Sequence, residues 1–150
     1  MSKEHTSYET ALAEMQRESP DVPRALALLQ EAVQGADPRA SYALGTWFLH
    51  GTHVARDVRK ATKLIRVAAD ANVVDALFDL AVAYETGVGV RKNLKLAARH
   101  YLRAALHGSD QATFEVGRCY YYGIGFERDR PAAKIWLDRA EELGIYESAS

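Results

Sequence analysis

Apolar and small residues recur along this chain at the spacing of an amphipathic helix. Ala40, Leu44 and Phe48 lie four residues apart, and a second run of the same kind begins at Ala61. Positions three or four residues apart share one face of an α-helix, so the pattern predicts helices that bury one face. No stretch alternates apolar and polar residues as a half-buried strand does. The chain is therefore predicted to be all-α.

The helical pattern repeats after 36 residues, three times over, with no insertion between the copies. A period between 20 and 50 residues is typical of repeat proteins, whose units bury their apolar faces only by stacking on their neighbours. The matching positions are Ala40/Ala76/Ala112, Leu44/Leu80/Val116, Gly45/Ala81/Gly117, Phe48/Tyr84/Tyr120, Gly51/Gly87/Gly123, Ala61/Ala97/Ala133, Ala68/Ala104/Ala140 and Asn72/Gly108/Gly144.

Capping residues recur in the same register. A short polar side chain before a helix can accept a hydrogen bond from an N–H of the first turn. Glycine or asparagine after a helix suits the left-handed backbone conformation, and the column Asn72, Gly108 and Gly144 fits that role. The predicted N-caps are Asp21, Asp57, Asn93 and Asp129. The helices expected from these limits span residues 5–18, 22–35, 38–50, 57–71, 74–86, 93–107, 110–122 and 129–143.

The Asp21 column indicates a fourth, degenerate repeat at the N-terminus. Tyr8 and Leu12 lie 36 residues before Leu44 and Phe48. Terminal repeats are atypical because one of their faces meets water. We therefore expect one repeat domain over residues 1–150, with repeats at about 5–39, 40–75, 76–111 and 112–147.

Composition and charge narrow the class of protein without naming a partner. The chain has 150 residues, 48% of them hydrophobic and 26% charged, with a formal net charge of −1. These values are typical of a globular domain and give no overall field towards nucleic acid or membranes. Residues 1–8 hold no apolar segment, no run is long enough to span a bilayer, and one cysteine cannot form an internal disulfide. A cytoplasmic location is the expectation.

The repeats share a motif that reads Ala-x-x-x-Leu-Gly-x-x-Tyr-x-x-Gly-x-Gly-Val, then Asp or Asn, Lys-x-Ala and a terminal Ala-Ala-x-x-Gly. This motif resembles the Sel-one-like repeat, a relative of the tetratricopeptide repeat. Residues 81–90 and 117–126 carry the best local matches. The resemblance implies a right-handed α-solenoid of four helix-pair repeats, about eight helices, with the first repeat degenerate. His53 departs from the motif because it replaces the second loop glycine. The cysteine pair of one secreted branch of the family is missing.

The resemblance further implies a binding surface on the first helix of each pair. Family members mostly act as adaptors that hold another protein or a peptide in a concave groove. Tyr42, Phe78 and Phe114 form a ladder in register, which either anchors a partner through large aromatic contacts or only packs helices. The residues expected to bind a partner are Arg39, Tyr42, Thr46, Leu49, His50, Phe78, Val82, Glu85, Phe114, Arg118, Tyr121 and Tyr122, with Asp75 and Gln111 on the same face.

The middle of the chain is basic. Between positions 56 and 103 lie ten Lys/Arg and five Asp/Glu, while both flanks have a net charge of −3. Six basic residues on two second helices are expected to form an outer patch, which is either a solvated surface or a dock for an acidic partner or RNA. No aromatic residues for base stacking are interleaved with it. The patch consists of Arg59, Lys63, Arg66, Lys95, Arg99 and Arg103.

The last repeat is rich in aromatic residues, and no ninth helix follows it. An uncovered apolar end can pair with a second copy of the chain, so a homodimer through the C-terminal end is one hypothesis. The alternative is that Ile145 and Tyr146 fold back as a lid. The aromatic residues are Tyr120, Tyr121, Tyr122, Phe126, Trp136 and Tyr146.

Chemical motifs are weak, so an enzyme, a cofactor or a bound metal is not expected. The glycines of residues 87–89 and 123–125 follow helices and lack the rest of a phosphate-loop motif. His50 and His53 lie close in sequence but have no neighbouring Cys, Asp or Glu ligands. Cys119 lies on a packed helix and is expected to be a buried, inert thiol.

The sequence therefore predicts a non-catalytic adaptor or scaffold that binds a partner protein or peptide in its groove, with neither membrane nor nucleic acid as partner. The alternative is a cytosolic immunity protein that neutralises a cognate bacterial toxin, a role that the family resemblance also implies.

Overall fold

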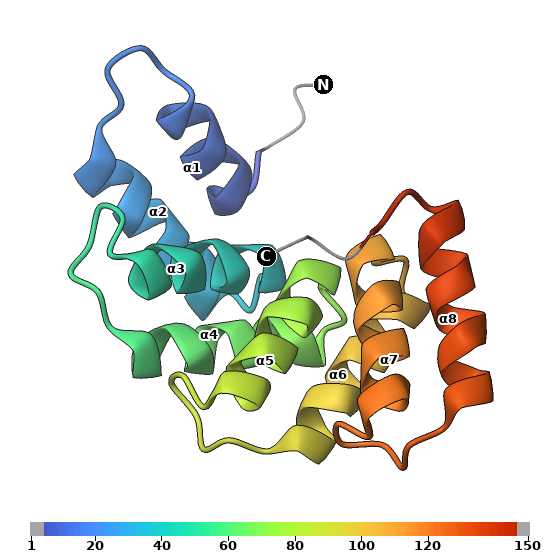
Figure 1. Cartoon of the computed structure of the whole chain (residues 1–150). Coiled ribbons are helices and arrows are strands. Elements are labelled where there is room, and N and C mark those ends of the chain that lie inside the picture. The colour runs from blue at the N-terminus through green and yellow to red at the C-terminus, as the bar shows by residue number, and fades with distance from the viewer. Residues whose placement is uncertain (1–4, 147–150) are drawn as a thin grey trace. The chain divides into compact units, whose positions relative to one another are not determined.

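A computed structural model describes residues 5–146 of the chain as helices joined by short loops (Figure 1). Within this range there are eight α-helices and no strand, which confirms the predicted all-α repeat fold. None of these helices is long and apolar enough to cross a membrane. The helices are α1 (Ser7–Met15), α2 (Val22–Gln34), α3 (Pro38–His50), α4 (Val58–Asp70), α5 (Val74–Thr86), α6 (Leu94–Leu106), α7 (Asp110–Tyr122) and α8 (Arg130–Glu142).

The chain forms two compact units, Met1–Val73 and Val74–Ser150. The first unit contains α1 to α4, coloured blue to green in Figure 1, and the second contains α5 to α8, coloured yellow-green to red. Within each unit every helix packs against the next one along the chain. Each unit thus consists of two helix pairs, as expected for stacked repeats.

The predicted N-caps are confirmed in all four repeats. Each cap has an extended backbone, and its side-chain oxygen accepts a hydrogen bond from the backbone N–H three residues later. The oxygen-to-nitrogen distances are 3.1 Å for Asp21, 3.0 Å for Asp57, 3.1 Å for Asn93 and 2.9 Å for Asp129. These caps explain why the starts of the second helices could be predicted to within a residue.

The predicted left-handed positions are also confirmed. Asn72, Gly108 and Gly144 have φ angles of 62°, 101° and 81°. His53, which replaces the second loop glycine, keeps the left-handed conformation with φ at 63°. The backbone of the loop is therefore retained although a side chain is present, and the His53 ring lies edge-on to Trp47 with ring centroids 4.8 Å apart.

The first helix differs from its expected span of 5–18, because α1 ends at Met15. In the later repeats the N–H of the cap residue donates to a backbone carbonyl of the preceding helix, as in the 2.9 Å bond from Asp57 to Phe48. In the first repeat the N–H of Asp21 instead donates to the carboxylate of Glu14 at 2.8 Å. A side chain thus closes this loop, where the other repeats use backbone and a glycine.

Glu14 is buried, with 4% of its surface exposed, and its carboxylate also pairs with Arg17 at 2.9 Å and Arg24 at 3.1 Å. The N–H of Asp21 lowers the pKa of the Glu14 carboxyl, burial opposes that shift, and the two arginines add to the lowering. Glu14 is therefore a buried carboxylate whose ion pairs and hydrogen bond connect α1 to α2.

The core of the second unit is built from small residues. Ala81, Ala97, Ala98, Val116 and Cys119 are fully buried, and partly buried aromatic side chains pack around them. Such residues let the helix axes approach closely.

One glycine marks the closest approach between α7 and α8. A Cβ on Gly117 would lie 2.7 Å from the Leu137 side chain. The absence of a side chain at Gly117 is thus a packing requirement.

Candidate functional site

One face of α7 forms the wall of a surface pocket in the second unit. Phe114, Arg118, Tyr121 and Tyr122 lie four, three and one residues apart and so project from the same side of the helix. Together with Leu137 of α8 they line a pocket of about 230 Å³. All four α7 residues were predicted from the sequence to bind a partner, and the structure brings them together.

Tyr122 is the most accessible member of the pocket, with 64% of its surface exposed. Its ring lies edge-on to Tyr121, with centroids 4.8 Å apart. Tyr121 is covered on another side by the guanidinium of Arg130, 3.7 Å from the ring centroid. The Arg130 Nε also donates to the Tyr121 carbonyl at 3.1 Å, which holds the cation over the ring.

Arg118 joins α7 to α5. Its Nη2 donates to both carboxylate oxygens of Glu85, at 2.7 and 2.9 Å, and its Nε donates to Glu115 at 2.7 Å. The three side chains are 21–27% exposed, so these bonds are partly shielded from water. Paired charges at this depth hold one rotamer more firmly than an exposed pair does.

Tyr101 of α6 completes the network, because its hydroxyl donates to Glu85 at 2.8 Å. Burial alone would raise the pKa of Glu85, but the hydrogen bonds from Arg118 and Tyr101 lower it below its ordinary value. Burial and the Glu85 carboxylate raise the pKa of the Tyr101 hydroxyl. Burial opposes the charge of Arg118, yet both carboxylates raise the pKa of its guanidinium above the usual value.

The arrangement suits binding rather than bond making. The pocket walls are aromatic and aliphatic, and the ion pairs beside them carry a net charge of −1. Cys119 on the same helix is fully buried, and burial raises the pKa of its thiol to about 12. A thiol in that state is a poor nucleophile at neutral pH. Over the range 5–146, no three His, Cys, Asp or Glu side chains are grouped so as to hold a metal ion.

The other predicted residues of the second unit divide between surface and core. Val82 of α5 is 37% exposed. Phe78 packs edge-on against Tyr101, with ring centroids 5.5 Å apart, and contacts the buried cluster. Phe78 therefore takes part in helix packing, whereas Phe114 of the same ladder lines the pocket.

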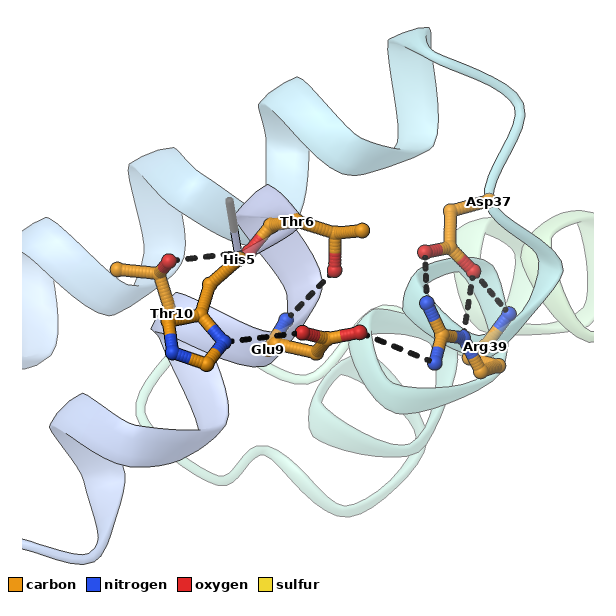
Figure 2. Close-up of polar contacts among 6 residues, drawn as sticks. All are labelled: His5, Thr6, Glu9, Thr10, Asp37 and Arg39. Carbon is orange, nitrogen blue, oxygen red and sulfur yellow. Dashed lines mark hydrogen bonds and ion pairs between the residues drawn. The ribbon is translucent and has the colours of Figure 1, made fainter. Parts of the chain in front are cut away.

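In the first unit, Arg39 of α3 is held by neighbouring acids (Figure 2). Its guanidinium donates to both oxygens of Asp37, at 3.1 and 2.9 Å, and lies 4.0 Å from Glu9 of α1. It also lies 4.5 Å from the centroid of the Tyr8 ring. Glu9 itself accepts from His5, so Arg39 is part of a small polar network between α1 and α3.

The remaining predicted residues of α3 have mixed surroundings. The Thr46 hydroxyl donates to the Ala43 carbonyl at 2.7 Å, and Leu49 packs against a buried cluster. Tyr42 is partly buried and His50 is exposed. A role of these residues in partner binding stays a prediction, as it does for the residues of the second unit.

Most aromatic residues of the last repeat serve the core. Tyr120 and Phe126 stack with ring centroids 4.5 Å apart, and Trp136 packs against the buried cluster. Tyr122 and Tyr146 are the strongly exposed tyrosines of the part that the structure describes. The aromatic content of this repeat therefore does not by itself make an apolar end surface.

Sequence reasoning missed three members of the site, namely Tyr101, Glu115 and Leu137. It proposed Glu85 and Arg118 separately as contacts for a partner and did not foresee that they pair with each other. Their separation of 33 residues is one repeat less one helical turn. Opposite charges at that separation on successive first helices were the available signal.

Comparison with known proteins identifies the family. The family model described as Sel1 repeat matches residues 38–73, 74–109 and 110–145. The chain belongs to the Sel1 repeat family. These repeats begin two residues before the starts chosen from the sequence, since α3, α5 and α7 begin before the first alanine of the motif.

Members of the Sel1 repeat family with solved structures share this fold. A protective antigen of uropathogenic Escherichia coli that displays an SLR fold superposes with a TM-score of 0.86 at 27% identity, over 93% of this chain and 30% of that one. A Sel1 repeat protein from Oxalobacter formigenes superposes with a TM-score of 0.75 at 31% identity, over 83% of this chain and 93% of that one.

Among curated proteins, DAP3-binding cell death enhancer 1 of Rattus norvegicus is 33% identical over 93 residues. The alignment covers 62% of this chain but 18% of the relative, so the chain spans less than a fifth of that protein's length. The name of the relative describes a protein that binds another protein.

Proposed function

We propose that this Sel1 repeat protein is a non-catalytic adaptor that holds a segment of another protein against α5 and α7 of its second unit. The observation that carries the proposal is the pocket of Phe114, Arg118, Tyr121, Tyr122 and Leu137, which combines aromatic walls with a fixed arginine. Clustered aromatic side chains around an arginine are typical of the centres of protein interfaces.

The mechanism is docking onto a preformed surface. An apolar side chain of the partner enters the pocket, where the phenylalanine and tyrosine rings supply contact area at low entropic cost. The Glu85–Arg118–Glu115 network fixes the pocket wall before the partner arrives. A preformed site reduces the ordering cost of association, which leaves more of the contact energy for binding.

Affinity purification from the native host, read by quantitative mass spectrometry, tests this proposal. We expect a protein that copurifies with the wild-type chain to be lost with the double variant Phe114→Ser/Tyr122→Ser. The matched control is Leu106→Ser/Ile135→Ser, which removes two side chains that are each 71% exposed and lie outside the pocket. Retention of the partner by the pocket variant, with helical content unchanged by circular dichroism, would show that the partner uses another surface.

The finer expectations stay predictions. These are the cytoplasmic location, the bacterial source, the homodimer through the C-terminal end and the immunity role. None of the three proteins compared above is described as an immunity protein. The adaptor role is preferred because one of them is named for binding a protein.

A further inference from the structure

A run of unbalanced positive charge lies on the second helix of both middle repeats. Residues 87–109 contain five Lys/Arg and no Asp or Glu. On α6, Lys95 and Arg99 lie one helical turn apart, and Arg59 and Lys63 hold the same places on α4, 36 residues earlier. All four side chains are exposed. We call these four residues the basic stripe; each compact unit carries one pair of them.

The side chains of the basic stripe make no ion pair or hydrogen bond, which is also true of Arg91 and Arg128 in the part of the chain that the structure describes. Several other basic side chains are paired: Arg39 binds Asp37, Arg118 binds Glu85, and Lys134 binds Asp138.

The stripe also opposes the stability of the helices that carry it. The N-terminus of a helix favours negative side chains; Lys95 and Arg59 lie in the first turns of α6 and α4, which contain no acid, and an acid, Asp57, is present only as the N-cap of α4. The first turns of α5 and α7 contain Asp75 and Asp110, whereas those of α2, α3 and α8 lack an acid, as α4 and α6 do. Like charges one turn apart, as in the pair Lys95 and Arg99, add a second unfavourable contribution. The repulsion between the two members of each pair is therefore a small cost to the helix that carries them.

The stripe is confined to the two middle repeats. At the corresponding positions the first repeat has Pro23 and Ala27, and the last has Pro131 and Ile135. A general need for solubility would not select two repeats out of four.

The geometry fits one class of partner. Basic side chains four residues apart on a helix are about 6 Å apart along its axis, as are carboxylates four residues apart on another helix. RNA is disfavoured because α4 and α6 expose no aromatic ring on which a base could stack. A membrane surface is disfavoured because most apolar side chains of both helices, including Ile65 and Tyr101, are buried or half-buried, which leaves Val67, Leu94 and Leu106 exposed.

We infer that the basic pair of each unit, Arg59 with Lys63 on α4 and Lys95 with Arg99 on α6, is a docking surface, distinct from the α7 pocket, for an acidic helical segment of a partner protein. The carboxylates of that segment pair with Arg59 and Lys63 or with Lys95 and Arg99. Pairing with the carboxylates of the partner replaces the repulsion between the two basic side chains of a helix by attraction. Binding therefore adds favourable contacts that the folded chain alone lacks.

Fluorescence anisotropy with a defined probe tests the inference. The probe is a fluorescein-labelled Ala/Leu peptide of roughly 18 residues, long enough to form a helix alone, with Glu at every fourth position. The reference peptide has Gln in place of each Glu. We expect the Glu peptide to bind at low salt, the Gln peptide to bind about tenfold or more weakly, and the difference to shrink as salt screens the charges.

Charge reversal then locates the binding. Lys95→Glu/Arg99→Glu should remove the site on α6 and about halve the amount of Glu peptide bound at saturation, and adding Arg59→Glu/Lys63→Glu should abolish binding. The control Arg128→Glu/Arg139→Glu changes the net charge by the same amount in the last repeat and should bind as the wild type does. Because Glu suits the first turn of a helix, the variants at positions 59 and 95 should melt no earlier than the wild type.

Three outcomes would overturn the inference. One is equal binding of the Glu and Gln peptides, or binding of neither. Another is an equal loss in the control variant. The third is a preference for a uridine oligonucleotide of about 20 nucleotides or for phosphatidylserine vesicles over the Glu peptide. Variants at Phe114 and Tyr122 should leave binding of the Glu peptide unchanged, which separates this surface from the pocket.

Discussion

Two glycines show how a similar backbone conformation can have different consequences at the level of single residues. Gly125 and Gly108 both have positive φ, 71° and 101°. A Cβ on Gly125 would collide with the Leu94 carbonyl and lie 2.8 Å from the Ala98 side chain, whereas one on Gly108 would meet nothing within 4 Å. The first position is thus constrained by backbone and packing, the second by backbone alone.

We expect Gly108→Ala to lower the free energy of unfolding by about 1 kcal/mol, because only the left-handed backbone is penalised. Gly125→Ala should lower it by roughly 3 kcal/mol, since overpacking adds to the same backbone cost. Urea denaturation followed by circular dichroism measures both. Equal losses would show that the helices around Gly125 can move to accommodate a Cβ with little loss in the free energy of unfolding.

Glu14 gives a pH dependence to the first unit. The pKa of its carboxyl in the folded protein lies below the ordinary value of 4.5, so its contribution to stability is present above about pH 4.5 and is lost as the pH falls through the folded pKa. We expect the wild type to exceed Glu14→Gln in denaturation midpoint at pH 7 and the two midpoints to converge towards pH 3. A difference that stays constant over this range would mean that the Glu14 carboxylate acts through its shape and not its charge.

At the level of elements, the contact between α5 and α7 depends on a shielded ion pair. Arg118 and Glu85 are 27% and 21% exposed, against 76% and 55% for the pair of Lys134 and Asp138 on α8. A double-mutant cycle with Glu85→Gln and Arg118→Met should give a coupling of about 1–2 kcal/mol. The cycle with Lys134→Gln and Asp138→Asn should give none that is measurable. Equal couplings would mean that apolar packing, and not this ion pair, stabilises the contact between α5 and α7.

The ends of the helices could be predicted because residues close to them in sequence determine where each helix begins and ends. Seven helices lie within a residue of their expected ends, since an acceptor such as Asp57 or a residue such as Gly108 acts through backbone hydrogen bonds only three or four positions away. The end of α1 was missed because the carboxylate of Glu14 accepts a hydrogen bond from the N–H of Asp21, the N-cap of α2, seven residues away. That contact needs a tertiary position that no local motif encodes.

The binding site was only partly predictable for a related reason. Helical spacing put Phe114, Arg118, Tyr121 and Tyr122 on one face, and the structure places them around one pocket. Spacing does not show which side chains of neighbouring helices meet that face. Phe78 therefore turned out to pack on Tyr101. Arg118 is paired through a contact between two helices, and the periodicity of the sequence does not predict such a contact.

At the level of the whole molecule, charge is distributed unevenly although its sum is −1. The middle of the chain has ten Lys/Arg and five Asp/Glu between positions 56 and 103, and both flanks are acidic. The sequence alone predicted this asymmetry, but not that the four residues of the basic stripe lack partners. Long-range steering by such patches acts on association rates and weakens with salt.

The outer face of α8 determines whether the last repeat can recruit a further helix. In α6, Ala98, Leu102 and Ala105 pack in the cluster shared with α7. The residues one period later on α8 are Lys134, Asp138 and Glu141, all exposed. A polar outer face is what a terminal repeat needs for solubility, and it weighs against the homodimer hypothesis.

Giving α8 the surface of α6 should therefore create an association site. We expect the wild type to sediment as a monomer and the triple variant Lys134→Ala/Asp138→Leu/Glu141→Ala to self-associate with rising concentration, because it exposes an apolar stripe that fits a further repeat. The control Lys134→Gln/Asp138→Asn/Glu141→Gln removes the same charges without adding apolar surface and should stay monomeric. Self-association of the control would mean that charge repulsion, not polarity of the face, keeps the molecules apart. A wild-type dimer that the triple variant leaves unchanged would place the contact away from α8.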